Sequence, residues 1–430
     1  MFWLLLILCA GLPTIQSEAV DVWRDQEKAA PADRPYLRYL ILYNLTDDDG
    51  RRGEARVVSR WWIHSLSMRR RMTRPKEIGK TLLRVDLRDY AWSADAWEKL
   101  AAADRYVDEY SVDTDVLEAL RYYSGSAKPL LRLDFFAARS CLEPDYSRFL
   151  GLPATLKELF AVLGVQEEAV KKLSLNIAGA KLESIVTLHN RQVERYPTIT
   201  GYFWKTRDVK SNVGDQAVLD NLFGVRADAG EYLFTLPNGL QGGYLTNGKG
   251  EQQAVAPAEI AVDSQTSFQD KQVFNYRNCI GCHEKGIRDV DDVVSALVKG
   301  RRLAIETYSK EDQRRIEELY LAPLVQTIGV DQGRYALAVY EACGRTPQEA
   351  SRQFLRLIHE YQEPLVDAAR AARELGVEVA ALAAVLDRAA RAYPAQSLSL
   401  LAIPAGAGLP VDQWEALFGF AAAAAKGAKQ

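Results

Sequence analysis

One short segment constrains this chain of 430 residues more than any other feature. Residues 279–283 read Cys-Ile-Gly-Cys-His, and no second Cys-x-x-Cys pair accompanies them. Residues three apart share one face of a helical turn, so two thiols at this spacing can meet one edge of a flat ligand. A histidine directly after the second cysteine can place a ring nitrogen below that ligand. The segment therefore predicts a helical turn that presents Cys279, Cys282 and His283 to one site, with Asn278 capping its start.

The Cys-x-x-Cys-His spacing is the attachment pattern of c-type haem. We expect Cys279 and Cys282 to form thioethers with the two vinyl groups of one haem c per chain. We expect His283 to be the proximal ligand of the iron. A zinc site needs four ligands, commonly from paired motifs, and the sequence offers one pair. A redox-active dithiol is the remaining alternative, against which the trailing histidine and the missing thioredoxin-like context argue.

The sequence leaves the opposite axial position of the iron open. No methionine follows residue 72, so the late methionine that small soluble cytochromes usually supply is missing. The remaining candidates are the other histidines and two earlier methionines: His64, His189, His359, Met68 and Met72. We rank His189 first as a possible distal ligand. An open sixth position, with Arg191 or His189 as a distal polar group, is the alternative.

Several segments resemble an uncharacterised family of exported bacterial proteins with one c-type haem motif. The matching segments are residues 84–92 (RVDLRDYAW), 202–205 (YFWK), 236–241 (LPNGLQ) and 256–260 (APAEI), together with the haem motif. The resemblance covers most of the chain and implies a redox-active haem protein without a settled reaction or partner. Family members carry histidine where this chain has Tyr196, and other residues at His64 and His189. The family's distal ligand therefore does not transfer to this chain.

The amino terminus predicts export. Residues 2–12 are apolar or small, Pro13 ends the run, and Ser17 and Ala19 supply small residues at positions −3 and −1 of a cleavage site. The run is too short to span a bilayer, which takes about 20 residues. We therefore expect a signal peptide over residues 1–19, a chain that is not transmembrane, and a periplasmic or extracellular location. Haem attachment to exported proteins takes place there. An uncleaved N-terminal anchor is the alternative.

The pattern along the rest of the chain predicts an α+β fold. We expect a mixed α/β region at 20–180, a strand-rich segment at 181–270, and a helical region at 271–430 that begins with the haem motif. Period-2 alternation predicts strands at 83–87 and 131–134, and residues 20–35 predict a loose lead-in. Asn238-Gly239 between two strand-like runs predicts a β-hairpin.

Composition narrows the class of function. The chain has 54 basic and 57 acidic residues, and a net charge of −3 gives no reason to expect nucleic acid as a partner. Electron transfer with a partner redox protein or a quinol-linked donor is the first hypothesis. A peroxidase-like haem enzyme with an open distal site, and a haem-bearing sensor or scaffold, are the alternatives.

Cys141 and Cys343 either form a disulfide or stay free and buried, and the sequence leaves this open.

Overall fold

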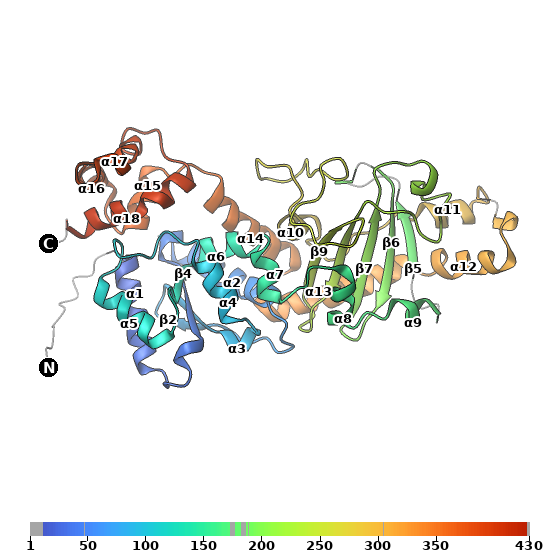
Figure 1. Ribbon diagram of the computed structural model, residues 1–430, viewed down its shortest axis with the longest axis horizontal. Helices are drawn as coiled ribbons and strands as arrows, with labels where there is room; N and C mark the ends of the chain where they lie inside the picture. Colours follow the sequence, from blue (N-terminus) through green and yellow to red (C-terminus); the bar gives the residue numbers. More distant parts are fainter. Residues whose placement is uncertain are drawn as a thin grey trace.

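The computed structural model describes residues 12–427, apart from residues 47, 173–176, 182–185, 188 and 304. Within these residues the chain is α+β, with one four-stranded and one five-stranded sheet. Figure 1 shows an elongated molecule, with the first sheet in the blue and cyan part and the second in the green part farther along the long axis. The predicted α+β class is confirmed.

Four short strands form the first sheet, in the order β2-β3-β1-β4. β1 pairs antiparallel with β3 and parallel with β4. All five residues of β1 are buried, as expected for a strand covered on both faces. The strands are β1 (Leu37–Ile41), β2 (Lys76–Ile78), β3 (Leu82–Asp86) and β4 (Leu130–Arg132). The helices of this part are α1 (Ile15–Lys28), α2 (Asp49–Ser65), α3 (Leu87–Tyr90), α4 (Ala94–Ala101), α5 (Thr114–Ser124), α6 (Leu133–Ser140) and α7 (Asp145–Leu150).

The second sheet is an antiparallel meander of five strands in sequence order. Gly239 has a φ of 85° in the turn between β8 and β9, a conformation that glycine adopts without steric cost, so the predicted hairpin is confirmed. Two short helices precede the sheet, α8 (Leu156–Leu163) and α9 (Glu167–Lys172). The strands are β5 (Ile177–Lys181), β6 (Arg191–Pro197), β7 (Tyr202–Asp208), β8 (Ala229–Thr235) and β9 (Gln241–Asn247).

The chain after residue 276 is helical in its regular elements and packs against both sheets (Figure 1). α11 and α12 contact β5, α13 contacts β5 and α2, and α14 contacts α2 and α6. The helices are α10 (Arg277–Cys282), α11 (Val293–Lys299), α12 (Lys310–Tyr320), α13 (Leu324–Cys343), α14 (Pro347–Gln362), α15 (Ala368–Leu375), α16 (Val379–Ala392), α17 (Pro394–Ser397) and α18 (Val411–Gly427). Short 3₁₀ turns complete the fold: Arg34–Tyr36, Tyr43–Leu45, Gly214–Gln216, Ile305–Thr307 and Leu398–Ala402.

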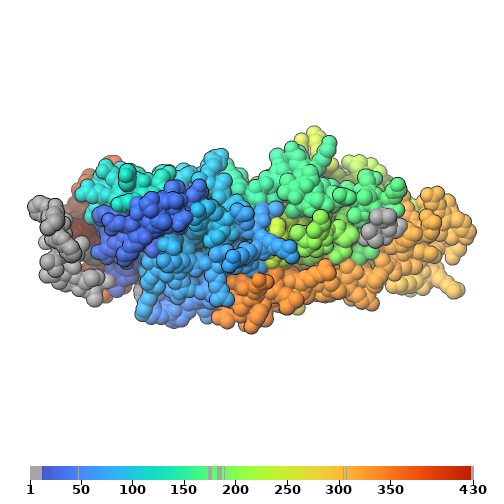
Figure 2. All heavy atoms as spheres, turned by 90° about the horizontal axis from the view of Figure 1, so that it is seen from below, coloured from blue at the N-terminus to red at the C-terminus, as the bar shows by residue number. Residues whose placement is uncertain are grey.

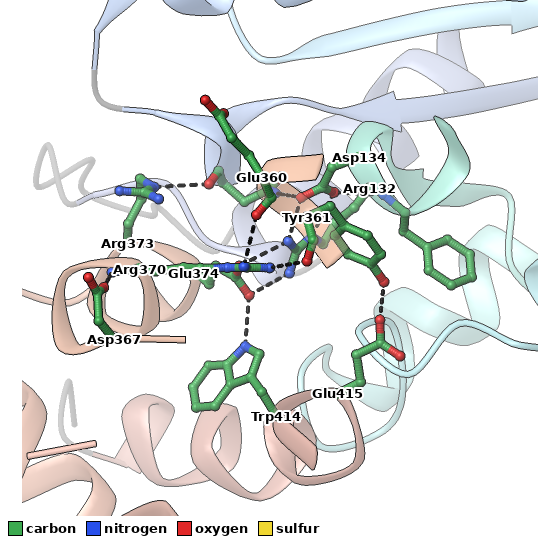
Figure 3. A network of polar contacts seen from close by, with 12 residues as sticks. Arg132, Asp134, Glu360, Tyr361, Asp367, Arg370, Arg373, Glu374, Trp414 and Glu415 are labelled. Carbon is green, nitrogen blue, oxygen red and sulfur yellow. Dashed lines mark hydrogen bonds and ion pairs between the residues drawn. The ribbon is translucent and has the colours of Figure 1, made fainter. Parts of the chain in front are cut away.

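A buried ion network joins the last helices to the first sheet (Figure 3). Arg132, at the end of β4, pairs with Asp134 and with Glu374 of α15, and all three side chains are almost fully buried. Arg370 adds a second positive charge, with its Nε 2.9 Å from Glu374 Oε1. The indole N–H of Trp414, on α18, donates to Glu374 over 2.8 Å. The network therefore ties α15 and α18 to β4.

The amino-terminal segment differs from its prediction. Residues 20–35 were expected to be a loose lead-in, whereas α1 begins at Ile15 and is capped by the Thr14 side chain. Ala19 and Val22 on this helix are fully buried, because they pack into the main core. The bond predicted to be cleaved, between Ala19 and Val20, therefore lies inside a packed helix. Residues 1–11 of the predicted signal peptide lie outside the described residues.

A second difference follows β4. The alternation at 131–134 predicts a strand, but the strand ends at Arg132 and α6 begins at Leu133. Asp134 accepts from the Arg132 guanidinium and from the backbone N–H of Phe135, which stabilises the first turn of a helix rather than an extended strand.

No described helix is both long and apolar enough to cross a membrane.

Candidate functional site

α10 carries the Cys-x-x-Cys-His motif as a single helical turn, as predicted. The backbone N–H of His283 donates to the Cys279 carbonyl over 2.8 Å, which continues the turn to the histidine. Asn278 does not cap this helix: it is the second helical residue, and Tyr276 is the capping position. The Asn278 side chain accepts a hydrogen bond from the Phe274 N–H and donates one to Asp263, so it fixes the loop before the motif.

Cys279, Cys282 and His283 line one hollow between α10 and the five-stranded sheet. The hollow measures about 1110 Å³ including its open mouth, and most of its wall is apolar. Sheet residues Val193, Trp204, Leu233 and Leu245 form one side. The loops before and after the motif add further apolar lining residues: Pro257, Ile260, Ala261, Val273, Ile287 and Val290. The fold therefore brings the three motif side chains together in one mostly apolar hollow, the polarity that is typical of cofactor sites.

Two hydrogen bonds fix the ring of His283, which is 8% exposed. Nδ1 lies 3.2 Å from the Gly286 carbonyl, and because a carbonyl only accepts, Nδ1 carries the proton of that bond. Nε2 lies 3.2 Å from Glu231 Oε1. Gly286 has a φ of 94°, and a side chain there would also press on Tyr335. The turn after the motif therefore requires glycine to hold its carbonyl against the ring.

Three buried charged residues stand behind His283 on the sheet. Arg191 Nε is 2.8 Å from Asp208 Oδ1, and its Nη1 is 3.2 Å from Glu231 Oε2. Burial alone would raise the pKa of Glu231, but the contact with His283 and the charge of Arg191 lower it to about 2. Burial lowers the pKa of Arg191, while its two carboxylates raise it above its ordinary value. Burial raises the pKa of Asp208.

The two thiols lie in an environment that disfavours thiolates. Cys279 is 3% exposed, and burial raises the pKa of its thiol well above the ordinary value. Burial also raises the pKa of Cys282, to about 12. Catalytic dithiols have a lowered thiol pKa, so these two cysteines lack the electrostatics of a redox dithiol. Within the described ranges, no group of three His, Cys, Asp or Glu side chains could hold a metal ion, so the zinc alternative finds no ligand set there.

The structure does not bring the other axial candidates to the hollow. His189 is half-buried and does not line the hollow. The wall that the described residues form also lacks the other four candidates: His64, His359, Met68 and Met72. His64 is buried beside Tyr90, and neither of its ring nitrogens has a hydrogen-bond partner among the described residues. Burial lowers its pKa to about 4. His359 contacts the ring of Phe268. Of the distal groups expected from the sequence, Arg191 is the one that lines the hollow.

Tyr196, where the resembling family has histidine, lies on the opposite face of the sheet from the hollow. Strand residues alternate between faces, and Arg191 and Val193 line the hollow, so Tyr196 points away from it. Its hydroxyl contacts Glu167 and Glu194. Cys141 and Cys343 are free and buried rather than joined in a disulfide.

The sequence reasoning missed Glu231 and Asp208. For Glu231 the usable signal is a charged residue in an otherwise mostly apolar strand that leads into the Asn238-Gly239 turn. Asp208 ends a strand that already holds other charged residues, so it has no such signal. Comparisons of the chain with protein-family models, with curated proteins and with solved structures gave no match.

Proposed function

We propose that this protein is an exported c-type cytochrome that carries one covalently bound haem and transfers electrons. One observation carries the proposal: Cys279, Cys282 and His283 line the same mostly apolar hollow. Cys279 and Cys282 would hold the haem through thioethers, and His283 would be the proximal ligand. When bound, the haem supplies one-electron iron chemistry whose potential depends on axial ligands, hydrogen bonds and burial.

The residues of the chain suit this role. The Gly286 carbonyl engages Nδ1 of His283, the second contact that metal-bound histidines usually make. Nε2, which contacts Glu231 Oε1, would have to give up that contact to bind the iron. The apolar wall of the hollow would exclude water from the haem, because Val193, Trp204, Leu233 and Leu245 offer few polar groups. A dry, rigid pocket suits electron transfer, which needs coordination that changes little between oxidation states.

A second candidate is a peroxidase-like haem enzyme with an open distal site. The observation that favours it is the absence of any methionine, or of any histidine besides His283, from the described wall of the hollow. Electron transfer remains the first proposal, because Arg191 is already engaged by Asp208 and Glu231 and is not free to act on a bound peroxide. The redox partner of the proposed cytochrome would be a small redox protein or a quinol-linked donor.

The two candidates are separated by the reactivity of the purified haem protein. We expect fast reduction by a small cytochrome or a quinol mimic, and no rapid reaction with peroxide or carbon monoxide. Rapid binding of either small molecule, with turnover of a reducing dye, would establish the enzyme instead.

We also propose export to the periplasm or beyond. The apolar run at residues 2–12 and the haem motif support it together, since attachment to exported proteins takes place outside the cytoplasm. Amino-terminal sequencing of the secreted protein tests the proposal. A new terminus near Val20 is expected, and membrane-associated protein with Met1 intact would contradict it.

A further inference from the structure

Glu231 makes contacts with two of the three motif residues through one oxygen. Its Oε1 lies 3.2 Å from His283 Nε2 and 4.0 Å from Cys279 Sγ. The same side chain is largely buried, at 13% exposure, at the base of the hollow. The carboxylate therefore touches one proposed thioether anchor and the proposed proximal ligand at the same time.

The other oxygen of Glu231 is held by the sheet. Its Oε2 lies 3.2 Å from Arg191 Nη1, and Arg191 is fixed in turn by Asp208 on the adjacent strand β7. Thr206 donates a further hydrogen bond to Asp208 over 3.0 Å. Three neighbouring strands, β6, β7 and β8, thus present one carboxylate to α10 in a fixed position.

We infer that Glu231, clamped by Arg191 and Asp208, is a positioning residue for haem attachment; this rests on the proposed function. In the chain before haem binds, Glu231 holds the ring of His283 and the thiol of Cys279 at the same edge of the hollow. When Nε2 becomes the iron ligand it has no further contact to give Glu231. The carboxylate then keeps Arg191 as its partner and remains a fixed negative charge near the haem.

This role has two consequences. Without the carboxylate, the motif loses the contact that orients two of its three side chains, so fewer chains become loaded. A negative charge near the iron also stabilises the oxidised state, which carries one more positive charge than the reduced state. Removing that charge should therefore raise the reduction potential of the chains that are loaded.

The test compares Glu231→Gln and Glu231→Asp with Glu194→Gln. Glu194 is a matched control, because it is also buried and paired with an arginine, Arg207, but lies on the opposite face of the same sheet. Each variant is expressed with a haem-attachment system, and the haem-to-polypeptide ratio and the midpoint potential are measured. Circular dichroism confirms folding.

We expect Glu231→Gln to lower the haem-to-polypeptide ratio below that of the wild type and to raise the reduction potential. Glu231→Asp should restore loading in part, and Glu194→Gln should match the wild type in both readouts. Normal loading and potential in Glu231→Gln, or equal losses in Glu194→Gln, would overturn the inference. A wild-type chain that takes up no haem would instead refute the proposed function itself.

Discussion

At the scale of single residues, the orientation of His283 depends on a backbone carbonyl rather than on a side chain. The turn at Gly286 places that carbonyl 3.2 Å from Nδ1, and Tyr335 of α13 closes the space where a side chain would stand. In the proposed function, the two cysteines would anchor the haem and the imidazole would bind its iron.

Replacing His283 by alanine should change the iron without releasing the haem. The thioethers belong to Cys279 and Cys282, so covalent pigment should persist with an altered spin state in the absorption spectrum. His359→Ala is the control, because His359 contacts Phe268 and does not line the hollow. A wild-type spectrum in His283→Ala would show that another group ligates the iron.

The sequence predicts the motif residues because their relation is local. Cys279, Cys282 and His283 are placed by the geometry of one helical turn, which spacing alone determines. Glu231 reaches the same site across 52 residues, through the register of β8 beside β7 and the packing of α10 on the sheet. No short pattern encodes such a contact, and the sequence marks Glu231 only as a charged residue in a mostly apolar strand.

At the scale of elements, the β8–β9 hairpin followed from its Asn-Gly turn, but α1 did not follow from its composition. The apolar positions Ile15, Ala19 and Val22 recur at helical spacing, and all three are buried. The same residues lie at the end of the predicted signal peptide and just after it, so the sequence pattern alone does not indicate a packed helix there. Glu18 is buried on the same face. A charged residue at that position makes the sequence resemble that of an exposed segment.

In the chain before cleavage after Ala19, Glu18 should make the free energy of unfolding depend on pH. Burial raises its pKa from the ordinary 4.5 to about 7, so the folded chain holds a proton that the unfolded chain releases. Its contribution is complete below pH 4.5 and is lost as the pH rises through 7. Glu18→Gln should therefore stabilise the protein by up to about 3 kcal/mol at pH 8 and by nearly nothing at pH 4.

Urea unfolding at the two pH values measures this difference in the chain that retains all of α1. Glu27→Gln is the control, because Glu27 is exposed on the same helix. Equal effects of Glu18→Gln at both pH values would show that Glu18 is not protonated in the folded state.

At the scale of the whole molecule, the last helices return to the first sheet. Figure 2 shows the orange band that includes α13 running along both the blue amino-terminal part and the green sheet. Beyond it, the Arg132 network holds α15 and α18 against β4 (Figure 3). The two ends of the described chain therefore share one core, which a division into successive regions does not predict.

Breaking this network should lower the free energy of unfolding. Arg132→Leu leaves Asp134 and part of Glu374 buried without a counter-charge, and loss of one partner from a buried pair typically costs about 3–5 kcal/mol. Arg391→Leu is the control, since its pair with Asp387 is exposed and should contribute less than about 0.5 kcal/mol. Urea unfolding measures both, and an Arg132→Leu variant as stable as the control would contradict the account.

We propose that one haem is covalently attached through Cys279 and Cys282, and the intact mass of the denatured protein shows whether it is. The wild type should be heavier than its polypeptide by one haem, with pigment that survives acid-acetone extraction. The Cys279→Ala/Cys282→Ala variant should have the mass of the polypeptide alone, while Cys141→Ala/Cys343→Ala should keep the haem. A wild-type chain with unmodified, alkylatable Cys279 and Cys282, or with haem that the solvent extracts, would contradict the account.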